Sequence, residues 1–429
     1  MNRYLINEMI VWKNAKARKP LIIQGARQVG KTWLMKEFGK QEFKQVVYLN
    51  FESSSRLKDL FIIDFNIERI IAVIEIETNQ KIISHNTLII FDEIQEVEKG
   101  LTALKYFQEQ APQYYIVAAG SLLGVSMQKN NSFPVGKVDF MRLYPMSFYE
   151  FLENLDYKNF VLQLQNKNWD VIDSFHEKLT ELLRLYYFIG GMPEVVSNYK
   201  ENKDLETVRI VQQKLLIGYE NDFAKYAPNE IVPKIKLVWN SLISQLSKEN
   251  RKFIYGQLKK GARAKDFEIA INWLVDAGLI LKVNRIEKPT LPLNAYADND
   301  AFKLFFHDIG LLNAIGNLDQ KILLEKNIIL TEFKGALTEQ FVCQQLIIKN
   351  QLYYWASSNT AEIDFVIQNK NEIIPIEVKA EENLKSKSLK VFVEKFENKN
   401  AIRTSMSKFR KENWLTNIPL YAVNEIIDL

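Results

Sequence analysis

One short stretch limits what this chain can fold into more than any other feature. Residues 25–32 read GARQVGKT, which fits the phosphate-loop pattern G-x-x-x-x-G-K-[ST], and they follow the apolar run Leu21–Gln24. In such a loop the glycines let successive backbone N–H groups point inward at the start of a helix, where they can hold a phosphate. The pattern therefore predicts a strand, a tight turn and a helix that bind a nucleotide.

Each part of this loop has an expected role. We expect the loop to bind ATP, with Lys31 reaching the terminal phosphates and the Thr32 hydroxyl contributing to a Mg²⁺ site. A glycine turn without a ligand is the alternative, and the strand before the loop and the helix after it argue against that alternative. The predicted nucleotide-binding residues are Gly25, Ala26, Arg27, Gln28, Val29, Gly30, Lys31 and Thr32.

A second signature follows in residues 88–93, where the apolar run LIIF ends in two carboxylates. Acids at the end of a buried strand are costly without a partner, so we expect Asp92 to hold Mg²⁺ together with Thr32. Glu93 would then polarise the attacking water. Ser121, after the next strand, is a candidate contact to the γ-phosphate, although an ordinary strand-ending turn would use the same residue type. The predicted catalytic residues are Glu93, Lys31 and Ser121.

The amino-acid composition limits the cellular compartment and the binding partners that we expect for this protein. A chain of 429 residues is long enough for about three domains. Its 56 Lys and Arg against 52 Asp and Glu leave a net charge of +4, so any contact with nucleic acid must be local. One cysteine and three histidines exclude an internal disulfide and a Cys/His zinc site. No run predicts an export signal or a membrane span, so we expect a cytoplasmic protein without a membrane partner.

Apolar runs alternate with helical stretches in the first third of the chain. The runs at residues 45–50, 88–91 and 115–119 are apolar on both faces, as is typical of a buried parallel sheet with crossover helices. Beyond residue 145 helical periodicity dominates. We therefore predict an α/β domain over residues 1–155 and a helical connecting region over residues 156–232.

The next stretch predicts three helices and a strand, an order typical of a winged helix, over residues 233–290. Four cations, Lys259, Lys260, Arg263 and Lys265, lie around the turn where such a domain would meet DNA. Acidic residues on the predicted third helix would repel the phosphates of DNA, so a winged helix that packs against protein remains the alternative.

Acidic residues stand out in the remaining region, residues 291–429, where a helix and three strands are expected before a basic helical end. If a hairpin closes about residues 370–371, Asp364 lies opposite Glu377, and Lys379 shares a strand face with Glu377. With Glu339 from the helix, this set could hold Mg²⁺ for attack on a phosphodiester. Ordinary salt bridges on a solvated strand face are favoured on spacing alone.

The basic end itself allows two interpretations. Residues 370–411 carry 11 Lys and Arg against 6 Asp and Glu. A segment with this surplus could follow a phosphate backbone, and it could equally be a solvated amphipathic helix.

Seven motifs, in this order, resemble those of the prokaryotic AAA-type P-loop ATPases that carry an uncharacterised C-terminal domain. The resemblance covers nearly the whole chain. The motifs are GARQVGKT at residues 25–32, FDEIQ at 91–95, GS at 120–121, LYPMSFYEF at 143–151, GGMPE at 190–194, DIGLL at 308–312 and IEVK at 376–379.

The resemblance implies an α/β fold with three parts: a P-loop NTPase parallel sheet, a helical and winged-helix segment, and a small restriction-endonuclease-like domain similar to the PD-(D/E)XK nucleases. The resemblance supports the hypothesis that Ser121 is a sensor-like residue. It also implies a nuclease-like set of Glu339, Asp364, Glu377 and Lys379. Many relatives place an arginine soon after a glycine where this chain has Gly136 and Lys137. Arg142 is therefore only a candidate arginine finger.

Three functional hypotheses follow. The leading one is a Mg²⁺-dependent ATPase whose nucleotide state is coupled to DNA binding or processing by the C-terminal module. A second keeps the ATPase and makes that module an inactive scaffold for protein or DNA. A third is a nucleotide-gated switch whose assembly, as a homo-oligomer or with a protein partner, depends on ATP.

Overall fold

The computed structural model describes residues 1–120, 136–246, 252–320, 331–357, 361–381, 386–398 and 400–426. The chain divides into two compact units. The first unit comprises residues 1–144 together with residues 276–279, and the second comprises residues 145–275 and 280–429. Ser121 lies outside the described residues, so its predicted role stays a prediction.

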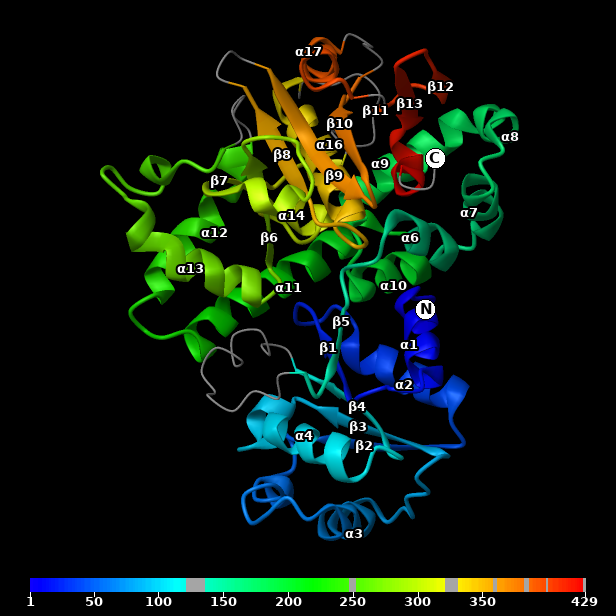
Figure 1. Ribbon diagram of the computed structural model, residues 1–429, viewed down its shortest axis with the longest axis vertical. Helices are drawn as coiled ribbons and strands as arrows, with labels where there is room; N and C mark the ends of the chain where they lie inside the picture. Colours follow the sequence, from blue (N-terminus) through cyan, green and yellow to red (C-terminus); the bar gives the residue numbers. More distant parts are fainter. Residues whose placement is uncertain are drawn as a thin grey trace. The chain divides into compact units, whose positions relative to one another are not determined.

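The first unit is built on a five-stranded parallel sheet in the order β2-β3-β4-β1-β5 (Figure 1). The parallel sheet predicted from the apolar runs is confirmed, and β5 is an edge strand that the sequence did not indicate. The elements are α1 (Leu5–Asn14), β1 (Leu21–Gln24), α2 (Lys31–Glu42), β2 (Gln45–Asn50), α3 (Ile67–Thr78), β3 (Thr87–Asp92), α4 (Gly100–Gln110), β4 (Tyr115–Ala119) and β5 (Asp139–Arg142).

Helices cover both faces of this sheet. On one face, apolar side chains of α3 and α4 pack against Ile89 and Phe91 of β3 in a continuous core. On the other face, Trp12 of α1 contacts Phe38 of α2, with the ring centroids 6.3 Å apart. Strands buried on both faces explain the unbroken apolar runs in the sequence.

The second unit begins with helices and continues as a mixed sheet. Its helices are α6 (Phe148–Asn154), α7 (Lys158–Gln165), α8 (Trp169–Ser174), α9 (His176–Ile189), α10 (Pro193–Asn202), α11 (Leu205–Tyr226), α12 (Val232–Leu246), α13 (Ala264–Asp276), α14 (Ile309–Ile315), α16 (Thr331–Leu346) and α17 (Lys387–Phe396). Its strands are β6 (Ile280–Ile286), β7 (Ala297–Phe306), β8 (Tyr353–Ala356), β9 (Glu362–Asn369), β10 (Glu372–Val378), β11 (Ala401–Ser405), β12 (Arg410–Lys411) and β13 (Leu415–Pro419).

These eight strands form one sheet in the order β12-β13-β11-β10-β9-β8-β6-β7 (Figure 1). The hairpin β6–β7 follows the three predicted helical segments and joins β8 through parallel pairing. The residues predicted as a winged helix and as a nuclease-like domain therefore share a sheet, and both assignments remain predictions. The expectation of a helical basic end is wrong for residues 401–419, because β11, β12 and β13 extend the sheet there.

Two of the family-like motifs contact each other in the second unit. The carboxylate of Asp308 accepts a hydrogen bond from the Gly191 amide at 2.6 Å and lies directly against Gly190, whose φ is +78°. A side chain at Gly190 would collide with that carboxylate, so glycine is required there. Burial raises the pKa of Asp308 to about 6. The GGMP and DIGLL motifs thus form one packed junction.

Across the residues that the structure describes, no helix is both long and apolar enough to span a lipid bilayer.

Candidate functional site

The loop between β1 and α2 has the backbone shape that its sequence predicts. Gly25 and Gly30 both have positive φ, +153° and +97°, and Gly30 is the N-terminal cap residue of α2. A Cβ at Gly25 would strike the carbonyl oxygen of Leu143. Only glycine therefore allows the tight curl that brings the loop to the end of the helix.

Lys31 is buried inside this loop, with 5% of its surface exposed. Its ammonium donates hydrogen bonds to the carbonyl oxygens of Gly25 and Ala26, at 2.9 and 2.8 Å. Burial lowers the pKa of Lys31 to about 8, even though the neighbouring Glu93 and Asp92 carboxylates act to raise it. A buried ammonium that donates to two carbonyl oxygens is well suited to exchange them for an anion.

The carboxyl ends of β2, β3 and β4 lie level with one another, because Asn50 pairs with Asp92 and Asp92 pairs with Ala119. Asp92 is buried at this edge, and its Oδ2 accepts a hydrogen bond from Thr32 Oγ1 at 2.7 Å. The hydroxyl of Tyr48 donates to the same oxygen at 2.9 Å. The structure therefore brings together Thr32 and Asp92, the two predicted Mg²⁺ ligands.

Glu93 follows directly in the left-handed conformation, with φ +51°. Its Oε2 accepts a hydrogen bond from Gln95 Nε2 at 2.6 Å. The carboxylate that we predict to polarise water is therefore oriented by a neighbour two residues along the chain.

The residues present fit a triphosphate with a divalent ion. Among the described residues, the N-cap of α2 makes no side-chain capping hydrogen bond, and the first turn carries no acidic residue, so the positive end of this helix is compatible with an anion. Thr32 and Asp92 offer a hydroxyl and a carboxylate, the hard oxygen donors that Mg²⁺ prefers. The loop backbone and Lys31 would hold the phosphates, and Thr32 and Asp92 would hold the ion.

The arginine-finger candidate is on the edge strand of this sheet. Arg142 is the last residue of β5, is exposed, and places its guanidinium 5.6 Å from the ring centroid of Tyr144. Lys137, which follows Gly136 in the sequence, forms an ion pair with Glu109 at 2.9 Å. Arg142 is therefore an exposed cation of the first unit, and its role in trans remains a prediction.

In the second unit, the predicted hairpin about residues 370–371 is confirmed. The register of β9 and β10 runs from the pair Asn369–Glu372 to the pair Phe365–Ile376. One residue further, the Asp364 carboxylate accepts a hydrogen bond from the Val378 amide at 2.7 Å. Lys379 Nζ lies 2.9 Å from Glu377 Oε1. Asp364 and the Glu377–Lys379 pair thus lie at the same end of the hairpin.

Glu339 of α16 has a different partner. It is fully buried, and its Oε1 lies 2.9 Å from the ammonium of Lys303, a fully buried residue of β7 that also forms an ion pair with Glu362. Within the described ranges, no three His, Cys, Asp or Glu side chains are grouped so as to hold a metal ion. The structure therefore gives Glu339 a lysine partner and does not assemble the predicted acidic metal site.

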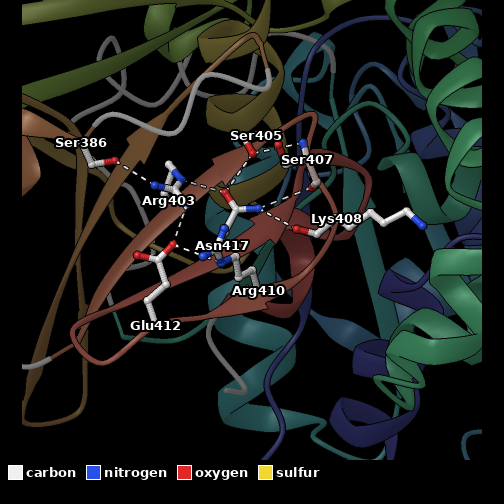
Figure 2. Close-up of polar contacts among 8 residues, drawn as sticks. All are labelled: Ser386, Arg403, Ser405, Ser407, Lys408, Arg410, Glu412 and Asn417. Atoms are coloured by element: carbon white, nitrogen blue, oxygen red, sulfur yellow. Dashed lines mark hydrogen bonds and ion pairs between the residues drawn. The ribbon is translucent and has the colours of Figure 1, made fainter.

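Another buried cation, Arg403 of β11, is surrounded by polar groups (Figure 2). It donates from Nε to Asn417 Oδ1 at 2.8 Å and from NH1 to Ser386 Oγ at 3.3 Å, and its NH2 is 3.6 Å from Glu412 Oε1. Burial lowers its pKa. Arg403 therefore holds strands and the start of α17 together and is not available to follow a phosphate backbone.

Sequence reasoning missed four polar residues of these sites: Tyr48, Gln95, Lys303 and Arg403. Gln95 alone had a signal, because it belongs to the FDEIQ motif. A lysine in a β-strand reads as an exposed residue, so nothing in the local pattern of β7 indicated that Lys303 is buried.

Comparison with protein families divides the chain into three matched segments. Residues 17–152 match the model of an AAA domain. Residues 180–322 and 334–423 match two different domains of unknown function.

Individual relatives match less of the chain. An uncharacterized protein of Mycobacterium bovis and one of Mycobacterium tuberculosis are each 34% identical over 80 residues, which is 18% of this chain and 17% of the relative. The matched stretch is thus less than a fifth of the length of these relatives.

Among solved structures, a Walker-type ATPase of Pyrococcus abyssi is similar over 73% of this chain and 95% of its own, with 14% identity and a TM-score of 0.46. The ORC1 protein of Aeropyrum pernix in complex with DNA is similar over 73% and 90%, with 12% identity and a TM-score of 0.28. The assignment of the first unit therefore rests on the AAA domain match, the parallel sheet and the geometry around Lys31 and Asp92. Residues 17–152 are a P-loop ATPase domain of the AAA type.

Proposed function

We propose that this protein binds and hydrolyses ATP in a Mg²⁺-dependent reaction. The observation that carries the proposal is the hydrogen bond between Thr32 and Asp92, which joins the phosphate loop to the end of β3 beside the buried ammonium of Lys31. Two motifs separated by 60 residues in the sequence thus meet at one edge of the sheet.

The residues divide the chemistry between them. The loop amides and Lys31 hold the phosphates and stabilise the negative charge on the transferred group. Bound Mg²⁺ would neutralise further charge on the phosphate oxygens. Glu93, oriented by Gln95, accepts a proton from the attacking water. Ser121 is proposed as a sensor of the γ-phosphate, and Arg142 as a residue that acts on a neighbouring subunit.

Two variants test the proposal. Lys31→Ala should abolish ATP binding or turnover, whereas Glu93→Gln should still bind ATP but hydrolyse it slower by a factor on the order of 10² or more. Glu98→Gln, an exposed acid outside the site, is the matched control. Unchanged phosphate release in both site variants would refute the assignment.

We further propose that nucleotide state is coupled to DNA binding through the cationic turn formed by the residues between η3 (Tyr255–Gln257) and α13 together with the start of α13. The four cations of this turn are all exposed, namely Lys259, Lys260, Arg263 and Lys265. DNA affinity should fall in a variant with all four changed to glutamine, and the dependence of binding on salt should become shallower. Equal affinity for duplex DNA in this variant and the unaltered protein would rule out the turn as the DNA contact.

The buried pair between Lys303 and Glu339 favours the alternative function for the C-terminal module, that of a scaffold without cleavage. An ammonium already neutralises the acid that a nuclease would offer to a metal. Single- and double-stranded DNA, incubated with the protein and Mg²⁺ or Mn²⁺, should remain intact. Cleavage that is lost in Asp364→Ala would instead establish the nuclease.

A further inference from the structure

The second unit contains a polar cavity of about 380 Å³, a volume that suits a ligand of nucleotide size. Three of its lining side chains, His176, Thr180 and Arg184, are spaced by four along α9 and so share one face of that helix. Lys334 of α16 lines it from a second helix. Glu177, an exposed residue of α9, also lines it. The two helices therefore give the cavity two cationic groups, those of Arg184 and Lys334, and one exposed carboxylate.

The other lining residues directly follow two strands of the sheet. Ala380 and Glu381 follow the end of β10, and Met406 follows the end of β11. These two strands are parallel neighbours, so the cavity lies outside the carboxyl ends of parallel strands. That is the edge at which open α/β sheets commonly bind ligands.

Charge indicates what the cavity would bind. Within the described ranges, Arg184 forms no ion pair, although it is partly buried. Lys334 forms a loose ion pair, at 3.7 Å, with Glu381, whose side chain is 59% exposed. An exposed pair of this kind adds little stability and is readily displaced. The guanidinium and the ammonium together match the charge of a phosphate monoester, about −1.5 to −2 near neutral pH.

Two hydrogen bonds hold the start of α9, the helix that lines one side of the cavity. His176 Nδ1 lies 3.0 Å from the hydroxyl of Tyr421, a buried residue, and Thr180 Oγ1 donates to the His176 carbonyl at 2.9 Å. These contacts hold the first turn of α9, on the helix face that Arg184 shares.

We propose that this cavity binds a phosphate monoester, with Arg184 and Lys334 as its principal contacts. The inference goes beyond ATP hydrolysis, because all the residues concerned belong to the second unit. The ester could be that of a free mononucleotide or the 5′-phosphate of a DNA strand, since the two carry the same group.

Calorimetry on the full chain tests the proposal, with Lys31→Ala present in every sample to suppress binding at the phosphate loop. The probes are inorganic phosphate, AMP, and a short oligothymidylate with and without a 5′-phosphate. Binding of AMP alone identifies a mononucleotide site. Tighter binding of the phosphorylated than of the unphosphorylated oligonucleotide identifies a strand-end site and separates it from DNA contacts elsewhere.

Three substitutions are expected to change the affinity for the phosphate probes in different directions. Arg184→Gln should weaken binding of the phosphate probes at least tenfold. Glu381→Gln should tighten it two- to fivefold, because the carboxylate that competes for Lys334 is gone. Lys178→Gln, which removes an exposed cation of the same helix outside the cavity, should change affinity less than twofold. The proposal is overturned if the unaltered cavity binds no phosphate probe, if Arg184→Gln has no effect, or if Glu381→Gln weakens binding.

Discussion

At the scale of single residues, this structure places charged groups where water is excluded and holds them with polar partners. Lys31 is the clearest case, because its ammonium is buried against two carbonyl oxygens and its pKa is lowered to about 8. The unfolded chain therefore binds more protons than the folded one between about pH 8 and the ordinary lysine value near 10.5. Below about pH 8 the folded protein carries the full energetic cost of a charged, buried Lys31. Its free energy of unfolding should therefore rise as the pH increases from about 8 to 10.5.

This lowered pKa predicts that ATP binding takes up a proton. Phosphates beside Lys31 favour its charged form, so the group should become fully protonated in the complex. We expect an uptake of about 0.1 proton at pH 7.0 and about 0.75 at pH 8.5, from the fraction of Lys31 that is neutral at each pH. Calorimetry of Mg-ATP binding in buffers of different ionisation enthalpy measures it. Equal uptake at the two pH values would contradict the assignment.

A second prediction concerns Tyr48, whose hydroxyl donates to the proposed Mg²⁺ ligand Asp92 at 2.9 Å. Tyr48→Phe should raise the Mg²⁺ concentration needed for half-maximal ATP turnover by about tenfold, because residues that orient a metal ligand affect metal affinity on this scale. Turnover at saturating Mg²⁺ should recover most of its value. Tyr106→Phe, in a ring stacked on Phe65, is the control and should leave the Mg²⁺ requirement unchanged. A Tyr48→Phe protein with an unaltered Mg²⁺ requirement would exclude this role.

At the scale of elements, buried ion pairs join segments that are far apart in the sequence. Lys303 connects the edge strand β7 to α16 through Glu339 and to β9 through Glu362. Its ammonium also lies 4.9 Å from the ring centroid of Tyr354 on β8. One side chain thus contacts three elements of the second unit besides its own.

Removal of this cation should be more damaging than removal of the whole buried pair. Lys303→Met leaves the Glu339 carboxylate buried without its partner, and we expect the free energy of unfolding to fall by about 3–5 kcal/mol. Lys303→Met combined with Glu339→Met should recover most of that loss. Urea unfolding of the unaltered protein, Lys303→Met, Glu339→Met and the double variant tests this. An additive double variant would show that the two side chains are not coupled. Lys390→Met, which breaks an exposed pair with Glu394, is the control and should have little effect.

At the scale of the whole molecule, the chain does not divide in sequence order. Residues 276–279, which run from the last residue of α13 to the residue before β6, belong to the first unit, although the residues on either side belong to the second. Gly278 has a φ of +75°, and a Cβ there would lie 3.1 Å from the amide nitrogen of Ala26 in the phosphate loop. A segment from far downstream thus forms part of the support of that loop.

This contact predicts a long-range effect on nucleotide binding. Gly278→Ala should weaken ATP binding about three- to tenfold, because the added methyl group presses on the loop backbone as well as straining its own. Gly261→Ala is the matched control: Gly261 has a similar φ, +79°, but has no atom within 4 Å of the added Cβ among the described residues. The ATP affinity of the Gly261→Ala protein should be unchanged. Equal losses in the two variants would mean that backbone strain alone is responsible.

The sequence by itself determined the features that local physics controls. The phosphate loop, the acids ending β3 and the apolar strands of the first sheet are each specified by adjacent residues, and the β9–β10 hairpin follows from its turn. Tertiary structure alone decided that Lys303 is buried with Glu339, that Arg403 is internal, and that residues 276–279 support the phosphate loop. These outcomes depend on which distant groups exclude water from a charge or fill a space, and no pattern of neighbouring residues encodes that.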